Sequence, residues 1–455
     1  MLGFVMFPLF MNKKTIMSSH SHLEITPSNV TSDGTLSFKN GQPVIQFIIG
    51  ESDRFILGDS IRFTGNFQVF LSENTLSTDA DQLSMSQRLG IYSCIDQLVI
   101  KSQRTNQVIE HLRNYNRFMS SYLSTTTSSN SDNLTHNNMT ALTVPNFEGV
   151  KQSVVNNLQN KGINPNAFAC ALPCGFFNGG QAIPLSADWG VGGLIVELHL
   201  APDNQVLFSQ NGTAGVAALS EAFYQFKNVS LICEAQNPQP SDLAALQKQT
   251  NQTFEYNSFS SYYTTINSAN AIINFNLGMK SVLGVFANFI PSAYINNFAQ
   301  NGLDTFYPIN SDNTTANVTQ LIFTRGGERF PLEYNIDTLQ SITSASDNSV
   351  YDAQLYRNYI NAVQSFSKNM RNTFKPENTK LIDAANANTY IDGGVAYGIG
   401  VALDTISNSG VDYSNVNFGI NMTMDLVTDN PQSVYLFVHS KNMLVFNQSG
   451  LQVSR

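Results

Sequence analysis

The chain has 455 residues, which is too long for one ordinary core and suits two or three domains. Apolar residues make up 42%, enough to fill such cores, whereas charged residues make up only 13%, well below the roughly 25% of typical soluble domains. The net charge is −9 and no Lys/Arg-rich run is present, which argues against a protein that binds nucleic acid through a basic surface. A polar but weakly charged surface suits β-rich folds with long loops and surfaces that contact neighbouring molecules.

The first eleven residues, MLGFVMFPLFM, are apolar but too few to span a bilayer. The basic pair follows the apolar run, whereas a secretory signal carries its charge first. Three interpretations stay open: a start codon upstream of Met11 or Met17, an interior tail that touches lipid, or an arm exchanged with a neighbour. We assign residues 1–45 to an N-terminal arm and expect the segment before about Pro43 to lie outside the folded domains.

Alternation with a period of two predicts strands at residues 61–71, 194–200 and 416–426, because every second side chain of a half-buried strand faces the core. The segment SVYLFVHSKNMLVF, residues 433–446, predicts a hairpin that turns near Ser440-Lys441-Asn442.

Helical periodicity is scarce. One helix is predicted from the spacing of Leu112, Tyr115, Met119 and Leu123, and a second from Leu355, Tyr359, Val363 and Phe366. The run STTTSSNSDNLTHNN at 124–138 predicts a loop. Residues 235–249 carry two prolines and then a short helix signal, so we place the domain boundary there, with domains at 46–238 and 239–455.

Arg-Asn-Tyr occurs in both helix predictions, at 113–115 and 357–359, and the flanks also match. The segments QLVIKSQRTNQVIE (97–110) and QLIFTRGGERFPLE (320–333) share Gln-Leu, an apolar pair, a polar turn, an apolar return and Glu. Two unrelated β-domains could share such patterns, but the agreement of order, spacing and identity favours duplication. We therefore predict that residues 97–119 and 320–363 occupy equivalent places in two barrels, with a loop inserted in the second copy.

Two tandem all-β domains with long loops and few helices predict a double jelly roll, that is, two tandem eight-stranded jelly rolls with short helices in the connecting loops. Three segments, 90–118, 174–208 and 434–453, together with 279–296, resemble the double jelly-roll major capsid proteins of the adenovirus, tailless-phage and large DNA virus lineage. The order and pattern of these segments most resemble those of the capsid proteins of polinton-like viruses and virophages. The resemblance covers most of the chain from about residue 55 onward and rests on order and overall pattern.

The resemblance implies a structural protein of the virion, assembled inside the host cell, whose chains form pseudo-hexagonal homotrimers that tile an icosahedral shell. It implies lattice contacts between trimers, penton and minor capsid proteins as partners, and no sequence-specific contact with nucleic acid; an internal membrane stays open. An alternative from another class is a carbohydrate- or receptor-binding jelly-roll module of a viral spike. An enzyme on a double β scaffold is a third hypothesis.

No constellation of residues points to catalysis: the chain lacks G-x-x-x-x-G-K-[ST], H-E-x-x-H and G-x-S-x-G, and no two histidines have metal-ligand spacing. We predict no catalytic residue, no cofactor and no metal site. His199 alternates outward on its strand, which favours a surface imidazole over a catalytic base. Cys170 and Cys174 form a single C-x3-C, too few ligands for zinc, and with Cys94 and Cys233 they are predicted to be buried free thiols.

Three further features allow either a structural or a functional interpretation. Trp189, the only tryptophan, is either a sugar-stacking platform or a packing residue beside a strand. The glycine-rich segment from Asp392 to Gly400 does not fit the dinucleotide pattern and indicates a close approach of backbones. Residues 310–317, NSDNTTAN, lack the glycine and terminal Glu of a calcium loop.

Overall fold

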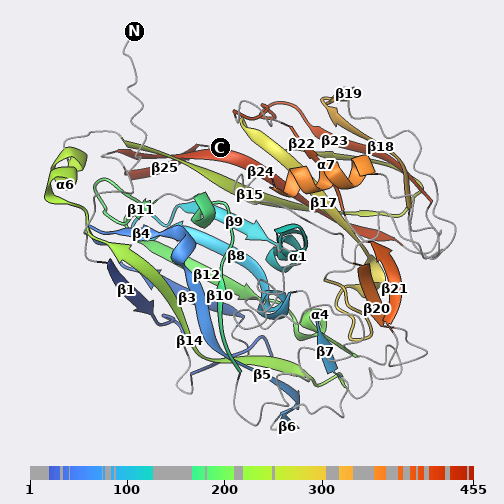
Figure 1. Ribbon diagram of the computed structural model, residues 1–455, viewed down its shortest axis with the longest axis horizontal. Helices are drawn as coiled ribbons and strands as arrows, with labels where there is room; N and C mark the ends of the chain where they lie inside the picture. Colours follow the sequence, from blue (N-terminus) through green and yellow to red (C-terminus); the bar gives the residue numbers. More distant parts are fainter. Residues whose placement is uncertain are drawn as a thin grey trace.

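The computed structural model describes residues 20–30, 34–39, 41, 43–73, 75–76, 83–86, 89–126, 166–179, 182–209, 219–247, 252–303, 317–331, 353–364, 378–382, 390–395, 398–403, 409–425, 431–447 and 450–454. These residues form six antiparallel sheets and a few short helices (Figure 1). Each sheet draws its strands from one half of the chain only, either up to Gln236 or from Gln252 onward.

Eight strands of the first half form two facing sheets. In chain order they are β1 (His20–Ile25), β3 (Val44–Ile49), β5 (Arg62–Ser72), β8 (Ile95–Ser102), β9 (Val108–Arg113), β10 (Asn166–Ala171), β12 (Leu194–Leu200) and β14 (Phe223–Gln236). One sheet has the order β1-β14-β5-β10 and the other has the order β3-β12-β8-β9. Counted along the chain, these orders are 1-8-3-6 and 2-7-4-5, the arrangement of a jelly roll.

The second half repeats this arrangement. Its strands are β15 (Gln252–Ile266), β16 (Asn270–Phe275), β17 (Val282–Pro291), β18 (Asn317–Arg325), β19 (Glu328–Arg329), β22 (Ile399–Ala402), β23 (Phe418–Asp425) and β24 (Gln432–Asn447). The sheet orders are β15-β24-β17-β22 and β16-β23-β18-β19, again 1-8-3-6 and 2-7-4-5. The predicted all-β fold of two eight-stranded jelly rolls is confirmed.

Additional short strands extend these sheets or pair with each other in two separate two-stranded sheets. They are β2 (Thr35–Leu36), β4 (Phe55–Leu57), β6 (Thr75–Leu76), β7 (Leu83–Met85), β11 (Ala182–Pro184), β13 (Leu207–Ser209), β20 (Asn378–Ile382), β21 (Tyr390–Val395) and β25 (Gly450–Ser454). Helix α6 (Pro240–Gln247) lies between the two halves, where the sequence predicted a short helix.

The two copies of the sequence repeat occupy equivalent positions, as predicted. In the first barrel, β8 pairs with β9 and the chain then forms helix α1 (Tyr115–Thr126). In the second, β18 pairs with β19 and the chain then forms helix α7 (Ala353–Gln364). Tyr115 and Tyr359 of the shared Arg-Asn-Tyr motif are both buried. Leu112, which was predicted to open the first helix, belongs instead to β9.

The predicted alternation accounts for the barrel cores. In β12, Leu194, Val196, Leu198 and Leu200 are buried, while the residues between them are half-buried. In β5 the buried residues are Phe63, Phe67 and Val69, and β23 begins at Phe418 with Phe418, Ile420 and Met422 buried. All ten residues of β17 are buried, which means that both faces of this strand are covered.

The hairpin predicted near Ser440-Lys441-Asn442 is wrong. These residues lie inside β24, a single strand that pairs with β15 along its whole length. The polar triplet marks a change in surroundings rather than a turn: Ser440 and Asn442 are buried and hydrogen-bonded to each other, and Lys441 forms an ion pair with Glu255 at 3.2 Å. No residue of the triplet is Gly or Pro, so none favours a tight turn. The strand instead turns back after Asn447, which pairs with Gly450 of β25.

The N-terminal arm predicted at 1–45 also needs correction. Residues 20–25 form β1, which pairs with β14 from His20 opposite Gln236 to Ile25 opposite Leu231. Thr35 and Leu36 also pair with β14, and β3 begins at Val44. The alternation of β1 is hard to see in the sequence because its inward residues, Leu23 and Ile25, are few and only partly buried. Residues 1–19 lie outside the described residues.

Two truncations separate the arm from the barrel. Deleting residues 1–26 removes β1 and its pairing with β14, and we expect the melting temperature to fall by about 5–10 °C. Deleting residues 1–16 stops short of β1, and we expect little change. Differential scanning calorimetry of both truncations makes the comparison, and equal melting temperatures would contradict a structural role for β1.

Candidate functional site: the junction between the barrels

The two barrels meet where edge strand β9 of the first barrel runs beside edge strand β15 of the second (Figure 1). The hydroxyl of Tyr256 on β15 donates to the carbonyl oxygen of Ile109 at 2.8 Å, and the backbone N–H of Arg113 donates to the hydroxyl of Ser261 at 3.0 Å. Side chains therefore link two strand edges that would otherwise present unpaired backbone groups.

A buried carboxyl group joins three segments at this junction. Glu110 on β9 is 1% exposed and accepts backbone N–H groups from Gly175 at 3.1 Å, Phe176 at 2.8 Å and Phe259 at 2.7 Å. The first two donors belong to the loop after β10, and the third belongs to β15 of the other barrel. Burial raises the pKa of Glu110 above its ordinary value, although the N–H groups of Phe259 and Phe176 oppose that shift.

Glycine is required at position 175 by the closeness of the second barrel. A Cβ atom there would overlap the carbonyl oxygen of Asn257 and the Cα of Ser258, both on β15. The loop after β10 thus lies directly against the backbone of the other barrel, and this contact brings the N–H of Gly175 to Glu110.

Helix α1 fills the rest of the junction. Its described side chains, residues 115–123, are all buried, including the polar ones. Phe118 packs against Phe259, Phe437 and Phe286 of the second barrel, with ring centroids 4.7, 5.7 and 6.2 Å away. The aromatic cluster joins one helix of the first barrel to three strands of the second, and burial of this apolar area holds the barrels together.

The polar side of α1 is matched by groups of the second barrel. Arg117 lies over the ring of Tyr435 at 4.3 Å from its centroid and donates to the carbonyl oxygen of Gly302. Burial lowers the pKa of Arg117, and the nearby Tyr435 and Asp96 oppose that shift. The side-chain N–H of Asn288 on β17 donates to the hydroxyl of Ser121 at 2.6 Å, and its carbonyl oxygen accepts a hydrogen bond from the hydroxyl of Tyr359 at 3.3 Å. Asn288 thereby connects α1, β17 and α7.

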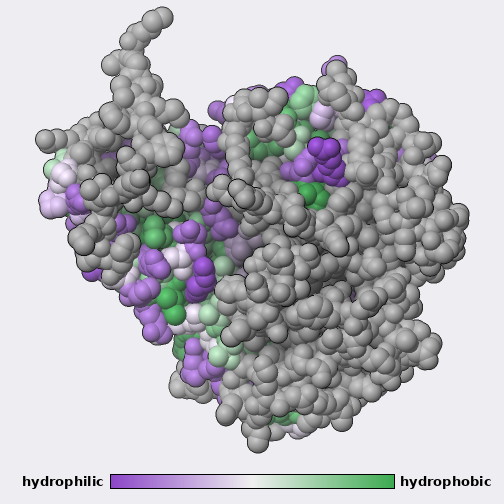
Figure 2. Space-filling view, in the orientation of Figure 1, coloured by the Kyte–Doolittle hydropathy of each residue, from purple (hydrophilic) through white to green (hydrophobic). Residues whose placement is uncertain are grey.

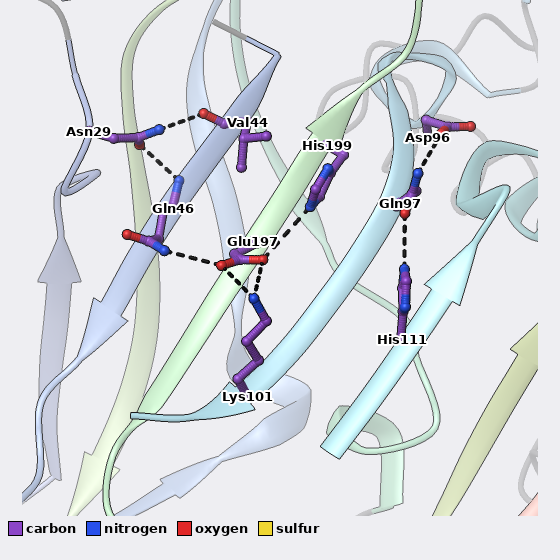
Figure 3. A network of polar contacts seen from close by, with 9 residues as sticks. All are labelled: Asn29, Val44, Gln46, Asp96, Gln97, Lys101, His111, Glu197 and His199. Atoms are coloured by element: carbon purple, nitrogen blue, oxygen red, sulfur yellow. Dashed lines mark hydrogen bonds and ion pairs between the residues drawn. The ribbon is translucent and has the colours of Figure 1, made fainter. Parts of the chain in front are cut away.

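A second polar cluster lies on the outer face of the sheet β3-β12-β8-β9 (Figure 3). Glu197 of β12 forms an ion pair with Lys101 at 2.8 Å, accepts a hydrogen bond from Gln46 at 3.1 Å and lies 3.7 Å from His199. Burial raises the pKa of Glu197, but the hydrogen bonds from Lys101 and Gln46 outweigh burial and leave the pKa lowered. Glu197 is therefore held as a carboxylate by its neighbours, in a cross-strand ladder that stabilises the sheet.

The histidine, cysteine and tryptophan residues considered for chemistry have structural surroundings. His199 is half-buried on the outer face of β12, as its alternation predicted. The four cysteines are buried free thiols, and burial raises the pKa of Cys170 to about 12 and that of Cys233 to about 11. Trp189 is buried and packs on Phe55 at 5.2 Å, which confirms the packing interpretation.

The glycine-rich segment confirms the predicted close approach of backbones. A Cβ at Gly400 of β22 would lie 2.9 Å from the Cβ of Ala362 and 3.2 Å from the Cα of Tyr359, so α7 packs tightly on this strand. Of residues 310–317, only Asn317 is described. Within the described ranges, no group of three or more His, Cys, Asp or Glu side chains is placed to hold a metal ion. Among the helices that the structure describes, none combines the length and apolar character that a bilayer crossing needs.

No protein-family model matches the chain, and no curated protein matches it in sequence. Solved structures do match its fold over nearly the whole chain. The Faustovirus major capsid protein has a TM-score of 0.54 at 12% identity and covers 97% of this chain and 93% of its own. A capsid chain of the virus PBCV-1 has a TM-score of 0.55 at 12% identity, covering 98% and 100%. A chain of the Sputnik virophage has a TM-score of 0.56 at 12% identity, covering 100% and 93%. The chain therefore has the double jelly-roll fold, which is the fold of these capsid proteins.

Sequence reasoning did not find Glu110 or Arg117 as functional residues. Glu110 was noted only as the last residue of the repeat, and Arg117 carried no signal beyond its place in a predicted helix. The available signal was a charged residue among the regularly spaced apolar residues of a predicted helix. Its partner could not be identified from the sequence, because Gly302 lies 185 residues further along the chain.

Removing the Glu110 carboxyl should loosen the junction. Glu110→Ala leaves three buried N–H groups without an acceptor, and we expect the free energy of unfolding to fall by about 3 kcal/mol or more. Glu110→Gln can keep one amide oxygen at the position that serves Gly175 and Phe259, so its loss should be smaller. Urea unfolding measures both variants, and an equal, small effect of the two would contradict the proposed geometry.

His439 makes the junction sensitive to acid. Its ring stacks on Phe259 at 5.0 Å, and burial lowers its pKa from 6.5 to about 3. The unfolded chain therefore binds a proton below pH 6.5 that the folded chain does not bind until about pH 3. Stability is fully present above pH 6.5 and falls by about 1.4 kcal/mol per pH unit through this window.

The variant His439→Gln tests this effect, because it removes the titrating group. Urea unfolding at several pH values should show a flatter decline for the variant than for the native chain. Asp203 has the opposite effect in the native chain and in the variant alike. Burial raises its pKa from 3.8 to about 6, so the folded chain binds this proton before the unfolded chain does, and stability rises as the pH falls from about 6 to 3.8. His22→Gln, at an exposed site on β1, is the matched control. Parallel declines in the native chain and His439→Gln would show that His439 does not carry the effect.

Proposed function

We propose that the chain is a major capsid protein that assembles as pseudo-hexagonal homotrimers and tiles an icosahedral viral shell. The observation that carries the proposal is the duplication: two jelly rolls of the same strand order are held by a buried junction in one chain. The fold shared with the Faustovirus major capsid protein and the PBCV-1 capsid chain supports it.

The mechanism is geometric. The Glu110 contacts and the α1 cluster fix the two barrels relative to each other, so each chain adds two similar units at a fixed angle. Three chains related by a closed cyclic axis then present six barrels, and a tile of that outline packs in a near-hexagonal lattice. Pentons of another protein close the shell, minor capsid proteins bind the lattice, and the location of the chain is the capsid of the virion, assembled inside the host cell. We propose no enzymatic activity and no sequence-specific nucleic-acid contact.

We further propose that the halves act as two barrel domains. The first spans 46–238, to which β1 is added, and the second spans 239–455, with α6 in the connection. The sheets support this division because each draws on one half of the chain.

The alternative, a carbohydrate- or receptor-binding module, depends on exposed aromatic residues that could stack on sugars. Among the described residues, Phe38 and Tyr263 are the exposed aromatic side chains, and they lie on different barrels. In Figure 2 the described residues of the visible face form small hydrophilic and hydrophobic patches that interleave. This surface favours distributed contacts between copies over a single binding site, and a glycan array tests the alternative directly.

The purified chain should be a trimer of three 50.1 kDa subunits, about 150 kDa, and its melting temperature should rise with protein concentration. Obligate interfaces bury roughly 2,000 Å² or more, and low surface charge means that salt should affect this one modestly. Light scattering at micromolar concentration and calorimetry over a range of concentrations are the measurements. A chain that stays monomeric and melts independently of concentration would contradict the assembly and favour the binding module.

A further inference from the structure

The duplicated helices differ in how they are covered. In α1, the described side chains from Tyr115 to Leu123 are all buried, because the second barrel lies against them. In α7, the apolar side is buried at Tyr359, Ala362 and Val363, but Arg357 and Asn361 are exposed. When the shared Arg-Asn-Tyr motifs are aligned, Asn361 corresponds to Arg117, which α1 buries against the second barrel. A hydrophilic patch lies over α7 in Figure 2.

The surface that covers α1 is defined by three strands of the second barrel. Phe118 contacts Phe259 of β15 and Phe437 of β24, and Ser121 bonds to Asn288 of β17. These strands are the first, eighth and third of the second jelly roll, and α1 lies across the outer face of their sheet. This cover and α7, whose Tyr359 packs on Phe286 and bonds to Asn288, together explain why both faces of β17 are buried.

The same three strands of the first barrel have an outer face that keeps its contact with solvent. They are β1, β14 and β5, in the same sheet order. His22 and Glu24 of β1 are exposed, and Thr64 of β5 and Glu234 of β14 are half-buried. In Figure 1, β1 lies at the left edge of the first barrel and α7 in the right half of the second, so these two surfaces lie on different parts of the chain.

We propose that α7 of one chain lies across the outer face of β1, β14 and β5 of a second copy, as α1 lies across β15, β24 and β17 within the chain. This inference rests on the proposed function and assigns the surfaces that join subunits. Among the described residues, α7 has an exposed side and the sheet of β1, β14 and β5 has an exposed outer face, and because these two surfaces differ the contact is head-to-tail and can close into a ring.

Charge complementarity supports this pairing of surfaces. Arg357 is the exposed cation on the described side of α7. On the sheet face, Glu24 lies opposite Ile232 and His22 lies opposite Glu234, which places Glu24 and Glu234 diagonally on the same outer side of β1 and β14. The opposite face of these strands carries Leu23 and Cys233, which point to the core. The proposed contact places the cation of the helix beside Glu24 and Glu234, on a sheet face that also carries Arg62 of β5 opposite Ile232.

A charge exchange tests the contact in the full-length chain. The variants Arg357→Glu and Glu24→Arg each place like charges at the contact, and we expect each to raise the concentration of half-assembly about tenfold or more. The double variant carrying both changes restores opposite charges and should return assembly close to the native value. Lys280→Glu and Glu73→Arg make the same charge changes at exposed positions elsewhere and should leave assembly unchanged. Light scattering over a dilution series measures assembly, and far-UV circular dichroism verifies that every variant is folded.

The outcomes separate this inference from the proposed function. Loss of assembly in folded single variants, with recovery in the double variant, supports the contact. If the native chain is trimeric and the single variants assemble equally well, or if the double variant fails to recover, the assigned surfaces are wrong while the trimer stands. If the native chain itself stays monomeric at every concentration, the proposed assembly fails and the contact fails with it.

Discussion

The fixed placement of the two barrels depends on the burial of one carboxyl group and one helix. Glu110 accepts two backbone N–H groups from one loop of the first barrel and one from a strand of the second, so neither barrel can shift without leaving a buried donor unpaired. Around it, Phe118 adds apolar contact to strands β15, β17 and β24. Directional hydrogen bonds set the relative position, and apolar burial supplies most of the favourable free energy. The result is a rigid pair of barrels rather than two domains on a linker.

The duplication provides similar barrels, but it does not by itself provide similar surroundings. Within one chain the first barrel has a neighbour on the side of α1, and the second barrel has a neighbour on the side of β15. On the corresponding sides of the other barrel, α7 touches the first barrel where it meets α1 near Asn288, and its residues Arg357 and Asn361 are exposed, as are His22 and Glu24 of β1. Divergence after duplication follows this difference: the position buried in α1 is Arg117, stacked on Tyr435, whereas the corresponding position in α7 is the exposed Asn361.

The sequence predicted those parts of the fold that depend on local pattern. Alternation found β5, β12 and β23, and the repeat of Arg-Asn-Tyr with its flanks found the duplicated strand pair and helix. It failed where a residue's surroundings change along one element. In β24, α1 covers the outer face near Tyr435 and Phe437, whereas the same face is polar near Lys441. This change from apolar to polar residues within one strand looks like a turn in the sequence. Strand β1 was missed because only Leu23 and Ile25 point to the core.

The junction was out of reach of the sequence for a different reason. A buried Glu on a strand and a buried Arg on a helix are ordinarily unfavourable, and their partners here are backbone groups and a ring supplied by distant parts of the chain. Backbone N–H groups leave no trace in the residue types that carry them. What the sequence does show is the consequence: a chain with only 13% charged residues has few charges to bury, so the groups that lie between barrels are mostly amides, hydroxyls and aromatic rings. The polar groups among them can form hydrogen bonds either with a neighbouring chain or with water. The same surface is therefore suitable both for an isolated chain and for a closed assembly of chains.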